Sequence, residues 1–190
     1  MAVNFPQIPF YFLRHGVTDH NLRRLVMGQL DIPLNDQGRR QARTAAAQIS
    51  TLGITSVVCS PLSRARETGE IVATRLGLPV MLAEGLRERD WGEMTGRPYH
   101  ELVRDSTPRA AETAEQFRSR VLLAMSMLSS SSPTLVVAHS GVCRVLRRHL
   151  NAGDAAGPVP NAIPLLFTPL PEGGWRESAV TPASCAIASE

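Results

Sequence analysis

Residues 9–16 have the sequence Pro-Phe-Tyr-Phe-Leu-Arg-His-Gly, an apolar run that ends in an arginine and a histidine. The run is short and bounded by proline and polar residues, so it predicts a buried strand over residues 9–13. Apolar runs of the same kind occur at residues 56–59 and 134–138. Continuous apolar strands are typical of a parallel sheet that is covered on both faces.

Segments with helical periodicity separate these strands. Asn35 is expected to begin a helix that carries alanines on one face, and Gly53 marks its C-terminal end. The pair Ser60-Pro61 predicts the N-cap and the first residue of a second helix, which Gly77 ends. The predicted helices therefore alternate with the predicted strands.

A third helix is predicted after Thr113, which fits a capping box with Gln116 and precedes apolar residues at helical spacing. Residues 163–168 and 174–180 predict an antiparallel pair of strands. The alternation of strands and helices predicts an α/β fold, with a mostly parallel central sheet between two layers of helices.

The composition limits the possible classes of protein. Of the 190 residues, 43% are hydrophobic, so we expect one domain over residues 1–190 with a frayed tail over about residues 181–190. No apolar stretch is long enough to span a membrane, and the N-terminus lacks the features of a secretory signal. A cytoplasmic protein with no membrane partner is expected.

Charge and cysteine usage exclude further classes. All 20 basic side chains are arginines, which excludes Schiff-base chemistry, and their scattered placement does not favour nucleic acid as a partner. The three cysteines have neither metal-site nor disulfide-framework spacing, so no metal is expected. Cys143 follows His139 by four residues, but we expect a core residue there rather than a nucleophile.

Polar side chains follow each predicted strand at its carboxyl end. Arg14 and His15 follow the first strand, Arg64 follows the second, and His139 follows the third. Carboxyl ends of parallel strands meet at the edge of a sheet where ligands bind, and helix N-termini there add backbone N–H donors. Two guanidiniums and two imidazoles at one edge predict a pocket for a dianion such as phosphate.

The same residues suggest a reaction. Guanidiniums nearby favour the neutral form of His15, whose lone pair can then attack phosphorus. Arg14, Arg64 and His139 would stabilise the transferring phosphoryl group without a metal ion.

The leaving oxygen needs a proton, which a carboxyl near the pocket could supply. Glu88, in the motif at residues 86–92, is the best placed by that motif. The simpler alternative for Glu88 is a salt bridge to Arg87 or Arg89, because Asp90 and Glu93 are nearby alternative acids.

Five blocks of sequence occur in a defined order between about residue 10 and residue 150. They are residues 13–16 with Thr18 and Asn21; residues 28–35 with Gly38, Gln41 and Ala42; residues 60–68; residues 86–88 with Trp91, Gly92 and Gly96; and residues 136–139 with Gly141, Val142 and Arg144. In these blocks the chain resembles the RHG-motif branch of the histidine phosphatase superfamily, also called phosphoglycerate mutase-like. The resemblance implies a three-layer αβα sandwich and no metal or organic cofactor.

The resemblance also implies roles for individual residues. His15 matches the nucleophile that becomes phosphorylated, and Glu88 matches the proton donor. Arg14, Arg64 and His139 match the other members of the phosphate pocket.

Substrate contacts are less well matched. Substrate-binding residues are expected at Arg14, Asn21, Gly28, Gln29, Arg64 and Ser140. The chain departs from the family pattern at His20, where an aromatic residue is usual, at Met27, where a polar residue is frequent, and at Ser140, where glycine is commoner. The roles of His20 and His100 stay open between the substrate rim and an exposed loop.

We therefore expect a metal-independent phosphatase that hydrolyses a small phosphorylated metabolite through a phosphohistidine intermediate. The alternatives are a phosphoglycerate-type phosphomutase and a non-catalytic module that binds a phosphorylated ligand. Cofactor-dependent mutases of the family carry a longer insert than the one at residues 96–113, which favours a phosphatase. The resemblance is also compatible with a homodimer.

Overall fold

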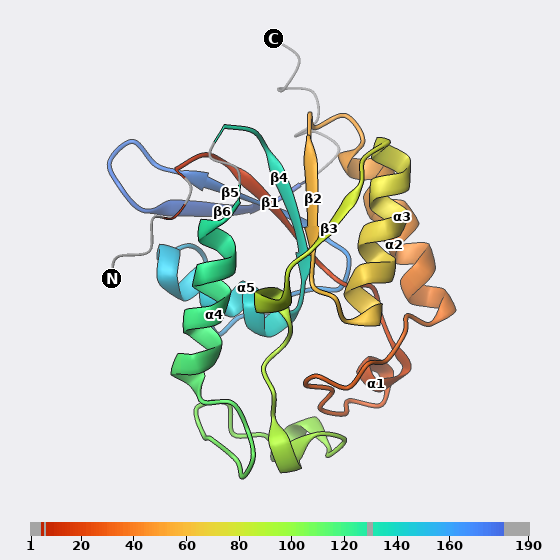
Figure 1. Ribbon diagram of the computed structural model, residues 1–190, viewed down its shortest axis with the longest axis vertical. Coiled ribbons are helices and arrows are strands. Elements are labelled where there is room, and N and C mark those ends of the chain that lie inside the picture. Colours follow the sequence, from red (N-terminus) through yellow and green to blue (C-terminus); the bar gives the residue numbers. More distant parts are fainter. Residues whose placement is uncertain (1–4, 6, 129–130, 181–190) are drawn as a thin grey trace.

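The computed structural model describes residues 5, 7–128 and 131–180 and is built on a six-stranded sheet in the order β3-β2-β4-β1-β5-β6 (Figure 1). The strands are β1 (Phe10–Arg14), β2 (Ser56–Cys59), β3 (Val80–Leu82), β4 (Thr134–Ala138), β5 (Pro164–Pro169) and β6 (Trp175–Ala179). β1 to β4 run parallel to one another, and β5 and β6 form the expected antiparallel extension. The expected α/β fold with a mostly parallel sheet is confirmed.

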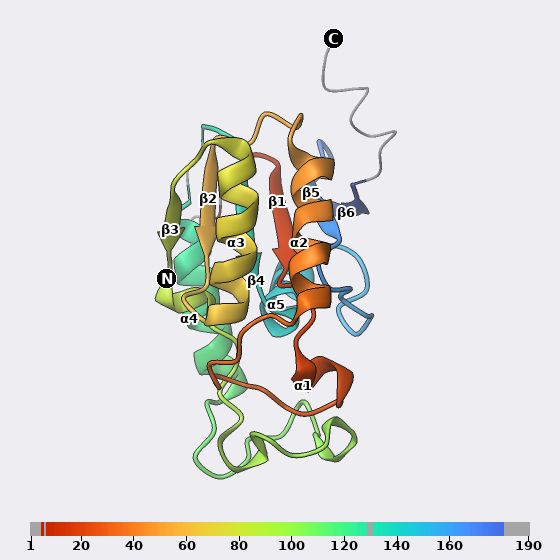
Figure 2. The same ribbon diagram turned by 90° about the vertical axis from the view of Figure 1, so that its right-hand side faces the viewer.

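The longer helices form two layers, one on each face of the sheet, and α1 (Asp19–Leu22) lies beyond the sheet edge (Figure 2). The longer helices are α2 (Asp36–Ile49), α3 (Ser63–Leu76), α4 (Ala114–Ser126) and α5 (Ser140–Leu150), with short 3₁₀ helices η1 (Glu84–Leu86), η2 (Gly92–Met94) and η3 (Tyr99–Glu101). α2 and α3 pack on one face, and α4 and α5 pack on the other. None of the helices in the described part of the chain has both the length and the apolar character that crossing a bilayer requires.

Alternating side chains of the central strands supply the two cores. In β4, Leu135 and Val137 pack with α2 and α3, whereas Val136 and Ala138 pack with α4 and α5. All five residues of this strand are buried. Burial on both faces is the reason the strand sequences are continuously apolar rather than alternating.

The helix signals agree with the structure, with two corrections. α2 ends at Ile49 with Ser50 as its C-cap, so Gly53 does not end the helix as predicted. Asn35 and Thr113 cap α2 and α4 as expected, and Gly77 ends α3 in the left-handed region. Ser60 is not the N-cap of α3, because the helix begins at Ser63 and the carboxylate of Asp31 accepts hydrogen bonds from the Ser63 backbone and side chain. Asp31 thus supplies from another loop the acceptor that Ser60 was expected to provide.

Two further differences concern short or terminal segments. β3 was not predicted, since Met81 and Leu82 are exposed at the edge of the sheet and give no burial pattern. The predicted tail, residues 181–190, lies outside the described residues.

The first turn of α2 is packed against the loop that follows β1. A Cβ atom on Gly16 would collide with the carbonyl of Gly38, and one on Gly38 would collide with the backbone of Val17. The side chains of Thr68 and Gln41 accept hydrogen bonds from the Gly16 and Val17 amides at 3.1 Å and 2.9 Å. Two helices of one layer therefore fix the loop next to His15.

Gly38→Ala is expected to destabilise the protein although alanine favours helices, because its methyl group must displace the Val17 backbone. The expected loss in free energy of unfolding is about 1–3 kcal/mol, measured by urea denaturation. Gln37→Ala, at the exposed neighbouring position, is the control and should change stability little. Equal stability of the two variants would contradict this account of the packing.

Candidate active site

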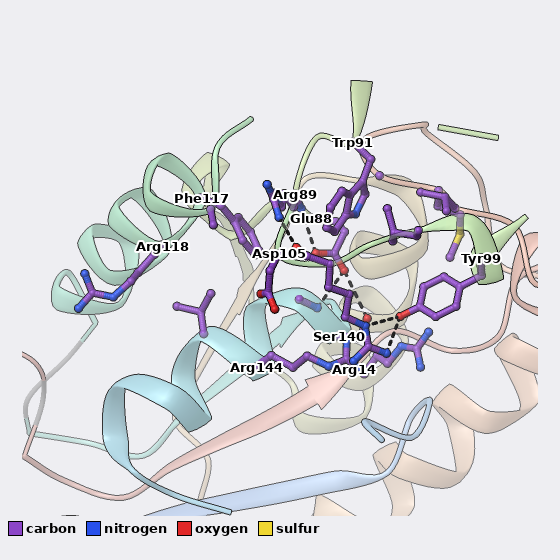
Figure 3. Close-up of a pocket in the computed structure, with 18 of the residues that line it drawn as sticks. Arg14, Glu88, Arg89, Trp91, Tyr99, Asp105, Phe117, Arg118, Ser140 and Arg144 are labelled. Atoms are coloured by element: carbon purple, nitrogen blue, oxygen red, sulfur yellow. Dashed lines mark hydrogen bonds between the residues drawn. The ribbon is translucent and has the colours of Figure 1, made fainter. Parts of the chain in front are cut away.

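The carboxyl ends of β1, β2 and β4 bring the predicted polar clusters together. Arg14 pairs with Ala138 and Cys59 pairs with Val137 in the sheet, so the segments that follow these strands leave the same edge side by side. A cavity of about 510 Å³ opens there, and Arg14, Glu88 and Ser140 point into it (Figure 3). The structure thus places Arg14, His15, Arg64 and Glu88 around one cavity.

His15 lies at the inner end of this cavity and is 2% exposed. Its Nδ1 lies 2.7 Å from the carbonyl oxygen of Gly16. A carbonyl oxygen can only accept, so Nδ1 carries the proton and donates it in this bond. The lone pair of the neutral ring is therefore on Nε2, the atom suited to nucleophilic attack.

Burial is the main reason that His15 is neutral. It lowers the pKa of His15 well below 6.5, and the charges of Arg64 and Arg14 lower the pKa further. The sequence argument relied on the guanidiniums alone, which are the smaller cause. Both causes favour the uncharged, nucleophilic form of the ring.

Arg64 is fully buried and contacts backbone oxygens rather than an acid. Its Nη1 and Nη2 donate to the carbonyls of Leu30 and Gly28 at 2.7 Å and 2.8 Å. Burial lowers the pKa of Arg64 to about 10. Glu67, three residues further along α3, lies 2.6 Å from Arg39 rather than pairing with Arg64. The Arg64 guanidinium therefore remains at the cavity.

Arg14 adds a second guanidinium beside His15, and His139 adds a second neutral imidazole. Arg14 Nη1 donates to the carbonyl of Val159 at 2.7 Å, and its Nε is buried without a hydrogen-bond partner. His139 is fully buried, with its ring centroid 5.3 Å from that of His15 and its Nε2 2.7 Å from the hydroxyl of Ser60. It lies behind His15 and is not among the residues that line the cavity.

Glu88 faces these groups from the other side of the cavity. One carboxylate oxygen accepts from the backbone N–H of Gly141 at 3.0 Å, in the first turn of α5, and the other accepts from the Arg89 amide at 2.9 Å. Arg87 pairs with Glu84, so Glu88 is not used in the simpler ion pair with Arg87. Glu88 is therefore oriented by backbone donors.

The alternative acids lie elsewhere. Asp90 accepts a hydrogen bond from the Gly92 amide at 2.9 Å, Glu93 is exposed, and neither lines the cavity. Among the described residues, no cluster of three or more histidines, cysteines, aspartates or glutamates has the geometry of a metal site. Cys143 is buried in the core, as expected.

The family model described as "Histidine phosphatase superfamily (branch 1)" matches residues 10–162, which include all the groups described above. The chain belongs to the histidine phosphatase superfamily.

Relatives within the superfamily carry two kinds of name. "Uncharacterized phosphatase PhoE" of Bacillus subtilis (strain 168) is 34% identical over 148 residues, or 75% of this chain and 77% of that protein. "Probable phosphoglycerate mutase GpmB" of Enterobacter sp. (strain 638) is 41% identical over 93 residues, and this match covers 49% of this chain and 43% of that protein.

A mycobacterial glucosyl-3-phosphoglycerate phosphatase solved in complex with VO3 has the same fold, with a TM-score of 0.75 and 26% identity. That match covers 90% of this chain and 98% of the other. The superfamily members similar to this chain thus include phosphatases and phosphoglycerate mutase-like proteins.

The expected substrate-binding residues of this superfamily member divide into two groups. Asn21, Gly28 and Ser140 line the cavity together with Arg14 and Arg64. Gln29 does not line it, and instead donates from Nε2 to the carbonyl oxygen of Glu88 at 3.2 Å.

The structure also shows where Met27, His20 and His100 lie relative to the cavity. Met27 lines the cavity, whereas His20 and His100 do not. His20 is half-buried and His100 is exposed. The two histidines therefore do not form part of the cavity wall.

Arg120 in α4 holds the turn that carries Glu88, and sequence analysis missed it. Its Nη1 donates to the carbonyls of Gly85 and Arg87 at 2.9 Å and 2.8 Å, and its Nη2 donates to the carbonyl of Glu88 at 3.0 Å. The carboxylate of Glu112 contacts the same guanidinium at 2.6 Å. No spacing rule connects a helix arginine with backbone carbonyls more than thirty residues away.

Arg89 has the corresponding role for the rim segment, residues 91–113, which covers one side of the cavity. Its guanidinium donates to the carbonyls of Glu112, Arg104 and Ser106 at 3.0, 2.8 and 2.9 Å. Its carbon Cζ lies 4.2 Å from the centre of the Trp91 ring. One buried side chain thus ties the two ends and the middle of the rim segment together.

The lowered histidine pKa values predict a pH dependence of stability. Burial is the first cause for His139 as well as for His15, and it lowers the pKa of both well below 6.5. As the pH falls through this value, the unfolded chain binds two protons that the folded chain does not. Stability is therefore fully present above the unfolded pKa and falls below it, by about 1.4 kcal/mol per pH unit for each histidine.

Urea denaturation between about pH 7.5 and pH 5.5 measures this slope. His139→Gln should remove about half of the slope of stability against pH, because one of the two protons is lost. His100→Gln, at an exposed position, should leave the slope unchanged. A slope that is the same in both variants would show that the buried imidazoles are not its source.

Proposed function

We propose that this protein is a metal-independent phosphatase that hydrolyses small phosphate monoesters through a phosphohistidine intermediate. The observation that carries the proposal is the hydrogen bond that His15 Nδ1 donates to the Gly16 carbonyl. This bond leaves the lone pair on Nε2, in a cavity that arginines and Glu88 also line. A cavity of about 510 Å³ has the size of a small-molecule site. A small phosphorylated metabolite is therefore the proposed substrate.

In the first step, Nε2 of His15 forms a bond to phosphorus as the bond from phosphorus to the leaving oxygen breaks. Glu88 in its acid form donates a proton to that oxygen. Arg14 and Arg64 stabilise the charge on the phosphoryl oxygens, and His139 supports the pocket from behind. In the second step, Glu88 removes a proton from water, which attacks phosphorus and releases His15.

Two buried atoms support the placement of the phosphoryl group. The Nε atoms of Arg14 and Arg64 are buried donors without hydrogen-bond partners among the described residues. A buried donor without an acceptor is costly, and a phosphate dianion offers several acceptors. The guanidiniums therefore favour the anionic substrate over a neutral one.

A phosphomutase is the second candidate, favoured by the similarity to GpmB. A mutase must protect phosphorylated His15 from water until a second substrate binds. Here the rim segment lacks long helices and Arg104 and Asp105 in it are exposed, which favours access of water and hence hydrolysis.

Phosphate release from p-nitrophenyl phosphate, 3-phosphoglycerate and sugar and nucleoside phosphates tests the two candidates. The wild type should release phosphate in the presence of EDTA, and His15→Ala should abolish release. Transfer of phosphate between phosphoglycerates without release would establish the mutase instead. Inhibition by EDTA, or activity that persists in His15→Ala, would contradict the proposed mechanism.

The role of Glu88 predicts a dependence on the leaving group. Glu88→Gln should lower the hydrolysis of alkyl phosphates by about 10²–10⁴-fold, and that of p-nitrophenyl phosphate much less, since nitrophenolate hardly needs a proton. Gly141→Ala should act in the same direction, because the new Cβ atom would collide with a Glu88 carboxylate oxygen. The new Cβ atom would meet only side-chain atoms, of Glu88 and Phe117, so this variant should stay folded.

Glu93→Gln is the matched control, since Glu93 is an exposed carboxyl outside the cavity. It should hydrolyse both classes of ester as the wild type does. Equal losses on both classes in Glu88→Gln would move the acid role elsewhere, and Asp90 would be the next residue to test.

A further inference from the structure

Two serine hydroxyls join β2 to β4, one at each end of the strand pair. At the start of the strands, the Ser56 hydroxyl lies 2.7 Å from the hydroxyl of Thr134. Just beyond the carboxyl ends, the Ser60 hydroxyl lies 2.7 Å from Nε2 of His139. The Ser60 amide also donates to the carbonyl of Val137 at 3.0 Å. The register of the sheet therefore holds the Ser60 hydroxyl against a histidine of the candidate active site.

The direction of the bond between Ser60 and His139 follows from the partners of each side chain. Both residues are fully buried, and buried polar groups are normally paired. The Leu62 amide donates to the Ser60 oxygen at 3.4 Å, so this contact uses a lone pair and not the hydroxyl hydrogen. Within the described part of the chain, the acceptor for that hydrogen is Nε2 of His139. Ser60 therefore donates to His139, and Nε2 accepts.

The opposite direction would leave more buried groups without partners. Burial lowers the pKa of His139 well below 6.5, so its ring is neutral and carries one proton. Nδ1 of His139 has no hydrogen-bond partner among the described residues. If Nε2 carried the proton, both the Ser60 hydrogen and the Nδ1 lone pair would be unpaired. With Ser60 as the donor, only the Nδ1–H is unpaired, and this arrangement is favoured because each unpaired buried group is costly.

The unpaired Nδ1–H of His139 is one of several buried donors near His15. The Nε atoms of Arg14 and Arg64 are also buried without partners among the described residues. His139 lies next to His15, because the His15 amide donates to the carbonyl of Ala138 at 3.0 Å and the two ring centroids are 5.3 Å apart. His139 does not line the cavity wall. A ligand would therefore meet its Nδ1–H at the inner end of the cavity, beside His15.

We infer that Ser60 is a positioning residue that acts through His139. Its hydroxyl fixes His139 in the tautomer with the proton on Nδ1, and this makes the ring a neutral hydrogen-bond donor to the phosphoryl group at His15. A neutral donor that is already oriented stabilises an anion without adding a third positive charge beside the two guanidiniums. The inference rests on the proposed function, because that reaction brings a phosphoryl group to His15.

The two histidines then carry their ring protons on the same atom with different consequences. In His15 the Gly16 carbonyl accepts from Nδ1, and the Nε2 lone pair is free to attack phosphorus. In His139 the Ser60 hydroxyl occupies the Nε2 lone pair, so this ring has no free lone pair for attack or for removal of a proton. The same tautomer therefore gives one nucleophile and one donor.

NMR spectroscopy of protein with isotope-labelled histidine tests the tautomer directly. Long-range proton–nitrogen correlations distinguish a ring with its proton on Nδ1 from one with its proton on Nε2, and His139→Gln identifies the His139 signals by their loss. In the wild type at neutral pH, His139 should carry its proton on Nδ1. Orthovanadate, a mimic of the transferring phosphoryl group, should shift the Nδ1 signal. A proton on Nε2, or an Nδ1 signal that orthovanadate leaves unchanged, would overturn the inference.

A double-mutant cycle tests whether Ser60 acts through His139. Ser60→Ala leaves the tautomer of His139 unspecified, so kcat and the affinity for orthovanadate should each fall by about tenfold. In the His139→Gln background, Ser60→Ala should cause almost no further loss, because the ring that Ser60 orients is absent. Ser56→Ala is the matched control. It removes a hydroxyl contact of the same 2.7 Å length at the other end of β2 and should leave both quantities unchanged.

The cycle separates a positioning role of Ser60 from a purely structural one. Equal losses from Ser60→Ala in the wild-type and His139→Gln backgrounds would overturn the inference, and so would full activity and full orthovanadate affinity in Ser60→Ala. If the wild type releases no phosphate from any ester, the phosphatase proposal fails, but the tautomer and the orthovanadate affinities still decide the role of Ser60.

Discussion

The burial of the Arg64 guanidinium is the constraint on which the site depends. A buried cation without an adjacent carboxylate is costly, and the protein offsets the cost with the carbonyls of Gly28 and Leu30 and with the more distant charge of Glu88. These contacts fix the loop that follows α1 against the start of α3. The buried guanidinium also produces a positive potential in the interior, which disfavours a positive charge on His15.

The same potential explains why the site suits a dianion. His15 and His139 are kept neutral by burial, so the fixed positive charge comes from arginines, whose charge does not depend on pH in the physiological range. In the proposed reaction, the nucleophile and the cations that bind phosphate are therefore different groups. Glu88 stays apart from both because backbone N–H donors, rather than a guanidinium, hold its carboxylate.

Sequence patterns predicted those features that depend on local chemistry. Strands buried on both faces are continuously apolar, and Asn35 and Thr113 carry the capping side chains themselves. The meeting of Arg14, Arg64 and His139 at one sheet edge follows from strand direction alone. The position of these three residues at one edge of the sheet can therefore be predicted from the sequence, whereas their roles belong to the proposed function.

Features that depend on distant backbone atoms were not predicted. Arg89 and Arg120 bind carbonyl oxygens, which every residue possesses, so no side-chain pattern marks their partners. The proline after Ser60 predicts Ser60 as the N-cap of α3, but the carboxylate of Asp31, from another loop, accepts the hydrogen bonds at the start of that helix. The size of the burial effect on His15 likewise depends on packing, which sequence spacing does not report.

The anchoring of the rim segment through main-chain oxygens has a consequence for how this enzyme family can diversify. Arg89 donates hydrogen bonds to three backbone carbonyls, and these bonds do not depend on the side chains of the residues that supply the carbonyls. Arg104 and Ser106 can therefore exchange side chains while the backbone of the rim segment stays in place. Selection for a new substrate can act on the cavity wall without disturbing the groups that carry out the reaction.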